Sequence, residues 1–107
     1  MVRLAPRLDR NHHEIVEALL ECPRGSECRG TVINLAGVHC GVPDLLVGIA
    51  GKTFLCELKD GEKSLSRQAL TPDQRRFIER WEGTPVVILN SADQARAWVA
   101  KVVGADG

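Results

Sequence analysis

The feature that most constrains the fold is a pair of apolar segments in the middle of the chain, at 44–49 and 53–59. Only the residues 50–52 separate the two segments. So short a connection predicts an antiparallel β-hairpin, because parallel strands need a much longer one. If the hairpin turns at residues 50 and 51, Asp44 faces Glu57 on the side of the sheet opposite to the apolar pairs.

The segments around this hairpin predict a helix and a strand before it, and a helix, a strand and a last helix after it. The first helix would be capped by Asp9 or Asn11, and Thr71 with Pro72 is a strong start for the second. The expected helices cover about 9–21, 71–81 and 92–102, and the expected strands about 31–35, 44–49, 53–59 and 84–90. This α-β-β-β-α-β-α order predicts an α/β fold with a mixed four-stranded sheet flanked by helices, in a single domain over 1–107.

Length and composition limit the classes of function. A chain of 107 residues that is 44% hydrophobic and 26% charged is typical of one globular domain. It contains neither an apolar run of membrane-spanning length nor the apolar stretch of a signal peptide, so we expect a cytoplasmic protein. The formal net charge is zero, and binding to nucleic acid would then depend on local basic patches. The candidates for such DNA contacts are Arg67, Arg75, Arg76 and Arg80.

The facing carboxylates of Asp44 and Glu57 carry the chemical argument. Like charges directly opposite each other in a sheet destabilise it by several tenths of a kcal/mol. A divalent cation such as Mg²⁺ removes this conflict, because it takes carboxylate oxygens as ligands and keeps several waters. The Leu58 carbonyl could serve as a further ligand, and Lys59 on the same side could contact a phosphate or an attacking water. The pattern favours metal-assisted phosphodiester hydrolysis, unless a bulge in the hairpin shifts the pairing by one residue.

The sequence around these residues resembles a known signature. Residues 41–48, Gly-Val-Pro-Asp-Leu-Leu-Val-Gly, and residues 56–61, Cys-Glu-Leu-Lys-Asp-Gly, are similar to the Pro-Asp…Glu-x-Lys pattern of the PD-(D/E)XK nuclease superfamily. Residues 70–74, Leu-Thr-Pro-Asp-Gln, and 81–83, Trp-Glu-Gly, resemble its VRR-NUC branch and related Holliday-junction-resolvase-like proteins of phages or bacteria. The resemblance extends over about 9–99 and includes the element order of that family's restriction-endonuclease-like core.

The resemblance implies a role for five residues. Asp44 and Glu57 would be catalytic metal ligands, and Lys59 would be the catalytic lysine. Glu14 matches the family's additional acidic residue near the metal, and Gln74 matches its catalytic glutamine on the helix after the core strands. The resemblance also implies Mg²⁺ or Mn²⁺ as the cofactor, branched or flapped DNA as the substrate, and a homodimer. We therefore predict a metal-dependent DNA endonuclease.

Two of these assignments compete with simpler explanations. Gln74 stands three residues after Thr71, where a capping box would use its side chain. Glu17 lies one helical turn from Glu14 and could take its place near the metal, or either glutamate could be a solvated helix residue. The sequence leaves both questions open.

The basic and aromatic residues of the two later helices also have alternative explanations. The arginines could form nothing more than a solvated face, although Arg76 and Arg80 share one side of their helix and could contact phosphates. Trp81 and Trp98 are expected to anchor the core rather than to stack on bases.

The cysteines suggest a rival function. Together with His39, they could form the zinc site of a small interaction protein, but their spacing lacks the short paired intervals of zinc ribbons. Cys56 is more simply explained as a small core residue. The four cysteines are Cys22, Cys28, Cys40 and Cys56. A second rival is a nucleic-acid-binding module of the same fold without turnover, against which the intact carboxylates and lysine argue.

Overall fold

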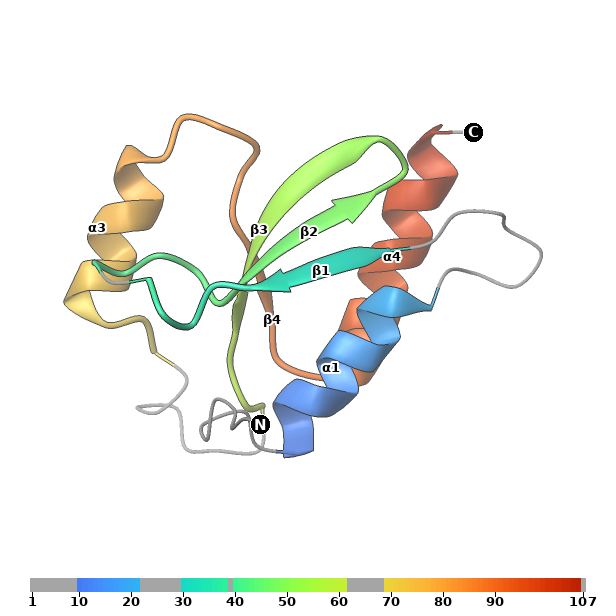
Figure 1. Ribbon diagram of the computed structural model, residues 1–107, viewed down its shortest axis with the longest axis horizontal. Coiled ribbons are helices and arrows are strands. Elements are labelled where there is room, and N and C mark those ends of the chain that lie inside the picture. The colour runs from blue at the N-terminus through green and yellow to red at the C-terminus, as the bar shows by residue number, and fades with distance from the viewer. Residues whose placement is uncertain (1–9, 22–29, 39, 62–68, 107) are drawn as a thin grey trace.

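A computed structural model of the chain confirms the predicted order of the elements (Figure 1). It describes residues 10–21, 30–38, 40–61 and 69–106; Cys22, Cys28, His39 and Arg67 lie outside the described residues. The helices are α1 (Arg10–Leu20), α3 (Pro72–Arg80) and α4 (Ala92–Asp106), and the strands are β1 (Thr31–Asn34), β2 (Leu45–Ile49), β3 (Lys52–Leu58) and β4 (Val87–Leu89). None of the helices in these ranges is long and apolar enough to cross a membrane.

The strands form one mixed sheet in the order β1-β2-β3-β4, so the predicted fold class is confirmed. β2 pairs antiparallel with β1 and with β3, whereas β4 pairs parallel with β3. A parallel pair needs a crossover connection, and α3 lies within it (Figure 1). The end of β3 therefore lies between β2 on one side and β4 on the other.

The hairpin of β2 and β3 has the predicted register. Leu45 faces Cys56, and the turn is formed by Ala50 and Gly51. Both turn residues have positive φ, 55° and 78°, as a type I′ turn requires. The shift of one residue that a bulge would cause is absent from this ladder. One step beyond the last pair, the same register brings position 44 opposite position 57.

One side of the sheet is the hydrophobic core, which α1 and α4 cover (Figure 1). Phe54 and Trp98 contact edge to face there with their ring centroids 4.9 Å apart, so Trp98 anchors the core as predicted. The buried core residues are Ile15, Ala18, Leu19, Leu45, Val47, Ile49, Phe54, Cys56, Leu58, Leu89, Ala95, Val99 and Val102. In β3 these are the even-numbered positions, so the odd-numbered ones face the other side.

The other side of the sheet is where α3 lies, apart from α1 and α4 (Figure 1). None of the residues of α3 is buried. The loop before β2 approaches this helix closely at Gly41, where an added Cβ would lie 2.2 Å from the backbone oxygen of Asp73. Gly41 also has a φ of 78°, which favours glycine. Only glycine therefore allows the chain that leads into Asp44 to pack against the start of α3.

Trp81, just after α3, does not lie in the core. It is 42% exposed and stacks on Phe77 with 5.4 Å between the ring centroids. The prediction that Trp81 anchors the core is wrong. The reason is that α3 lies on the side of the sheet opposite to the core and buries none of its own side chains.

The two cysteines in the described ranges lie in different environments. Cys56 is a buried core residue, as predicted, and burial raises the pKa of its thiol to about 12. Cys40 is exposed and lies in the loop beside α3. Since these cysteines lie on opposite sides of the sheet, they cannot share one metal ion. The described residues thus give no support to a zinc site that uses both.

Candidate active site

Glu57 stands out because it is the one buried charged residue in the described ranges, at 2% exposure. It lies near the end of β3, where β2 and β4 flank it, and pairs with Ile88 of β4. Removing a carboxylate from water is costly unless a counter-charge or hydrogen-bond donors replace the water. The neighbours of Glu57 therefore decide what this position can do.

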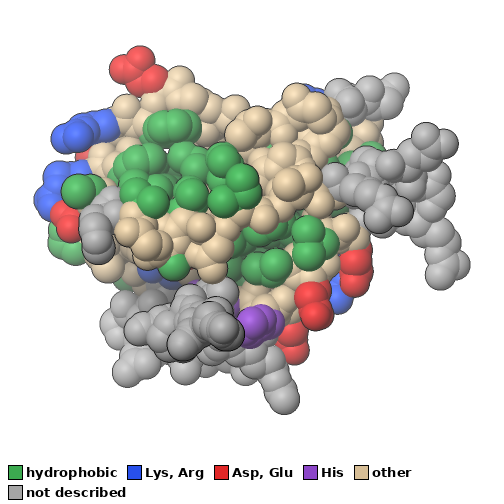
Figure 2. Space-filling model, viewed as in Figure 1, with side chains coloured by type: hydrophobic (Ala, Val, Ile, Leu, Met, Phe, Trp, Pro, Cys, Tyr) green, Lys and Arg blue, Asp and Glu red, His purple; other side chains and the backbone are tan. Residues whose placement is uncertain are grey.

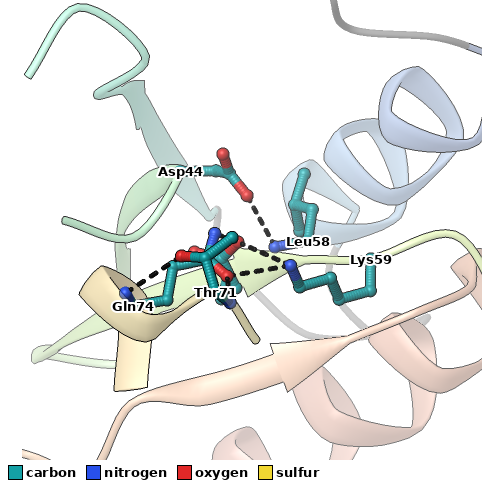
Figure 3. Close-up of polar contacts among 6 residues, drawn as sticks. Asp44, Leu58, Lys59, Thr71 and Gln74 are labelled. Carbon is teal, nitrogen blue, oxygen red and sulfur yellow. Dashed lines mark hydrogen bonds and ion pairs between the residues drawn. The ribbon is translucent and has the colours of Figure 1, made fainter. Parts of the chain in front are cut away.

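Asp44, across the hairpin, is held by a backbone group of β3 and by one from the residue that follows β1. Its backbone oxygen accepts a hydrogen bond from Leu35 N (2.7 Å). Its carboxylate Oδ2 accepts one from Leu58 N (2.8 Å) on β3. Figure 3 shows the carboxylate directed from the start of β2 toward β3. The hairpin thus brings two carboxylates together on one side of the sheet.

Lys59 and Gln74 complete the cluster (Figure 3). Lys59 Nζ lies 3.7 Å from Glu57 Oε2 and donates a hydrogen bond to Gln74 Oε1 at 3.0 Å. Gln74 Nε2 donates in turn to Glu57 Oε2 at 2.7 Å. The three side chains form a closed set of contacts between β3 and α3. The Lys59 side chain is only 11% exposed, so water screens its charge weakly.

If both carboxyl groups were ionised, this cluster would carry a negative charge, with two carboxylates against one ammonium group. Burial raises the pKa of the Glu57 carboxyl to about 8, and the repulsion by Asp44 adds to this shift. Lys59 acts in the opposite direction but does not outweigh them. In the absence of a further cation, burial and Asp44 therefore favour the protonated form of Glu57.

Gln74 has both of the roles that the sequence left as alternatives. Its backbone N donates to Thr71 Oγ1 (3.2 Å), and its side-chain Oε1 accepts from Thr71 N (2.9 Å), which completes the capping box of α3. The same Oε1 also accepts from Lys59 Nζ, since an amide oxygen has two lone pairs, and Nε2 remains for Glu57. The start of α3 thus positions the cluster.

Glu14 does not join this cluster. It is exposed on α1, and together with Glu17 it lines a hollow that the start of α4 also borders. The prediction that Glu14 lies near the metal ligands therefore lacks support. The physical reason is that α1 packs on the core side of the sheet, whereas Asp44 and Glu57 project from the other side.

The remaining predicted residues have mixed outcomes. Leu58 contacts the cluster through its N–H, and the use of its carbonyl as a ligand stays a prediction. Arg75, Arg76 and Arg80 are all exposed on α3, and Arg76 pairs with Asp73. Their contact with DNA also stays a prediction, as does that of Arg67.

Two positioning residues were missed by the sequence reasoning. Asn11, considered as an N-cap, lies inside α1, and its Nδ2 donates to the backbone oxygens of Lys59 and Asn90, both at 3.2 Å. It thereby joins α1 to the ends of β3 and β4. Gly41 is the second, through its close contact with α3. The glycine three residues before Asp44 was a usable signal, but nothing in the sequence distinguishes Asn11 from an ordinary helix residue.

The cluster has the chemistry of a small divalent-cation site. Two carboxylates on adjacent strands are a usual protein contribution to Mg²⁺, which takes its other ligands from water and phosphate. In the described ranges, no group of three or more Asp, Glu, His or Cys side chains could hold a metal ion. Asp44 and Glu57 are the two carboxylates that this cluster offers to a cation. A bound cation would also favour the ionised form of Glu57, which burial and Asp44 disfavour.

Comparison of the chain with models of known protein families, with curated proteins and with solved structures gave no match. The function is therefore argued from the geometry and chemistry of this cluster.

Proposed function

We propose that this protein is a metal-dependent endonuclease that hydrolyses DNA phosphodiester bonds and uses Mg²⁺ or Mn²⁺. The observation that carries the proposal is the convergence of Asp44 and buried Glu57 at the end of the hairpin, next to Lys59. A polar cluster selected for stability alone would not place a second carboxylate beside a buried one, because the repulsion costs free energy of folding. A divalent cation turns that arrangement into a favourable one.

Each member of the cluster has a distinct task in this reaction. Asp44 and Glu57 would hold the cation, with the Leu58 carbonyl as a further oxygen ligand. When bound, the cation supplies Lewis acidity at the scissile phosphate. Lys59 Nζ can stabilise the negative charge that develops on the phosphate or orient the attacking water. Gln74 is a positioning residue, because it contacts both Lys59 Nζ and Glu57 Oε2.

The substrate is inferred from the motif resemblance and from the basic residues of α3. We propose DNA with branches, flaps or junctions as the substrate, cut by a homodimer. Arg75, Arg76 and Arg80 are exposed on the helix that carries Gln74, so phosphate contacts there would lie close to the cluster. Arg67 is a further predicted contact.

The test is nicking of flap, Y-form and junction DNA by the purified protein in Mg²⁺ or Mn²⁺. Glu57→Ala and Lys59→Ala should each lower the rate by about a hundredfold or more, because each removes a charge from the transition-state environment. Glu17→Ala is the matched control: the residue is exposed on α1, on the other side of the sheet, and its loss should leave the rate unchanged. Circular dichroism of each variant checks that the chain still folds.

Two outcomes would contradict the proposal. Undiminished nicking by Glu57→Ala and Lys59→Ala would show that the activity resides elsewhere. Binding of branched DNA without nicking in either metal would favour the rival function, a nucleic-acid-binding module that has the fold but no turnover.

A further inference from the structure

A groove with a volume of about 560 Å³ runs along α3. Asp73, Arg76, Phe77, Arg80 and Trp81 form one wall of this groove, and Cys40 and Val42 from the loop before β2 form the other. Figure 2 shows Lys and Arg side chains at the edge of the molecule where α3 lies, beside a patch of hydrophobic side chains. The groove thus combines an apolar surface with two arginines, of which Arg76 is paired with Asp73 and Arg80 adds a further positive charge.

An aromatic pair dominates the α3 wall. The rings of Phe77 and Trp81 stack with 18° between their planes. The indole Nε1 of Trp81 donates to Thr84 O at 2.8 Å, and Gly83 packs so closely on the indole that an added Cβ would lie 2.7 Å from the ring. Trp81 is therefore held in one orientation and is still 42% exposed. A rigid, exposed indole contributes little to folding but is a good surface for a flat ligand.

The charged residues of the groove indicate which flat ligand fits. Arg76 and Arg80 are separated by one helical turn and border the aromatic pair. Aromatic rings for bases and cations for phosphates are the combination by which proteins bind single strands of nucleic acid. A second copy of this chain is less well matched, because its formal net charge of zero offers no general attraction to the arginines.

The groove and the candidate active site share their framework. Val42 lies two residues before Asp44, so their Cα atoms are at most about 7.6 Å apart. On the other wall, Asp73 directly precedes Gln74, and Gly41 packs against both of these residues. A strand whose base lies in the groove would therefore bring its backbone toward the two carboxylates.

We infer that this groove holds an unpaired base of the substrate strand next to the bond that is cut, so that the protein selects single-stranded segments over continuous duplex. The link to cleavage rests on the proposed function. The binding of the base does not, and it is measured separately.

The test uses the full chain in EDTA, where no cleavage occurs, and a single-stranded DNA oligonucleotide as the probe. The chain has two tryptophans, so Trp98→Phe leaves Trp81 as the only indole. Its fluorescence should be quenched as the oligonucleotide binds. Trp81→Leu should bind the single strand about tenfold more weakly, and Trp81→Phe should lie between it and the wild type, because one stacking contact is weakened. Blunt duplex binding should change less than twofold in either variant.

A charge variant separates stacking from phosphate contact. Arg80→Gln should lower the slope of log Kd against log salt by about one, because one phosphate contact is lost. Trp81→Leu should leave that slope unchanged, since stacking releases no counterions. Trp98→Phe without further change is the control for loss of a tryptophan away from the groove, and it should bind the single strand as the wild type does.

Wild-type affinity of Trp81→Leu for the single strand would overturn the inference. A dimer that dissociates in Trp81→Leu while the DNA affinity stays constant would also overturn it, since a second copy would then fill the groove. If Trp81→Leu bound the single strand more weakly but the wild type never nicked DNA, base binding in the groove would be supported and the proposed function contradicted. If Trp81→Leu bound and nicked flaps as the wild type does, the proposed function would be supported and base binding in the groove contradicted.

Discussion

The two sides of the sheet bury different kinds of side chain from the same hairpin, with opposite effects on stability. On the core side, Leu45 and Cys56 face each other and are buried under α1 and α4, where burial of each apolar group stabilises the fold. On the side of α3, Asp44 and Glu57 lie one step beyond the end of this ladder, and burial of the Glu57 carboxylate opposes folding. The comparison indicates that apolar burial on one side offsets the cost of the buried carboxylate on the other.

The largest expected effect is on the core side. Leu19→Ala should lower the free energy of unfolding by about 3–4 kcal/mol, because Leu19 is fully buried and its truncation leaves a cavity. Nicking by the fraction that stays folded should be unchanged, since Leu19 lies on the other side of the sheet from the cluster. Urea unfolding and nicking assays measure the two quantities. Leu20→Ala, the neighbouring residue at 48% exposure, is the matched control and should change the stability by less than about 0.5 kcal/mol. A large loss of nicking in folded Leu19→Ala would break the separation of the two sides.

The second effect is on the cluster side and has the opposite sign. The pKa of Glu57 is about 8 in the folded protein and about 4.3 in an unfolded chain. Between these pH values the folded state binds more protons, so the stability of the metal-free protein should fall as the pH rises. Glu57→Gln removes this dependence, so its stability advantage over the wild type should be roughly 3–4 kcal/mol larger at pH 8 than at pH 5. Urea unfolding in EDTA across this range measures it.

Addition of Mg²⁺ or Mn²⁺ provides the control for that measurement. In the proposed function, a cation binds the ionised carboxylate. Mg²⁺ or Mn²⁺ should then stabilise the wild type more as the pH rises, and Glu57→Gln much less. If the free energy of unfolding changed with pH in the same way for both proteins, with or without metal, the raised pKa of Glu57 would be contradicted.

The smallest expected effect on stability is at the start of α3, the helix that carries Gln74. Thr71→Ala removes the hydroxyl that accepts from Gln74 N and should lower the stability by about 1 kcal/mol. Nicking should fall a few-fold as well, because the first turn of α3 holds Gln74 against Lys59 and Glu57. Thr71→Ser keeps the hydroxyl and should behave as the wild type in both assays. Lost stability with an unchanged nicking rate would mean that the cluster does not depend on the helix start.

Local sequence patterns were sufficient for those parts of the protein that short-range interactions determine. The hairpin followed from two apolar runs with a two-residue turn, and its register decided which residues face each other. The start of α3 followed from Thr71 and Pro72. The pairing of Asp44 with Glu57 was predictable for the same reason, since a hairpin register needs no information from the rest of the chain.

Long-range contacts account for the predictions that failed or stayed open. Glu14 was assigned from the family resemblance and Trp81 from its large aromatic side chain, but the side of the sheet on which each helix packs decides their surroundings. Gln74 was predicted to be either a capping residue or a site residue. Only the packing of α3 near β3 shows that its side-chain amide caps the helix and also contacts Lys59. Asn11 offered no signal, because its two acceptors lie 48 and 79 residues away in the chain.

The sequence by itself determined the helices and strands, the hairpin register, and which two carboxylates and which lysine that register brings together. Each of these depends on neighbours within a few residues. Only the tertiary structure decided that Glu57 is buried, that the glutamates of α1 lie apart from the cluster and that an exposed indole borders a groove beside it. These depend on how the helices pack across the sheet, and the free energy of that packing comes from contacts between residues far apart in the chain.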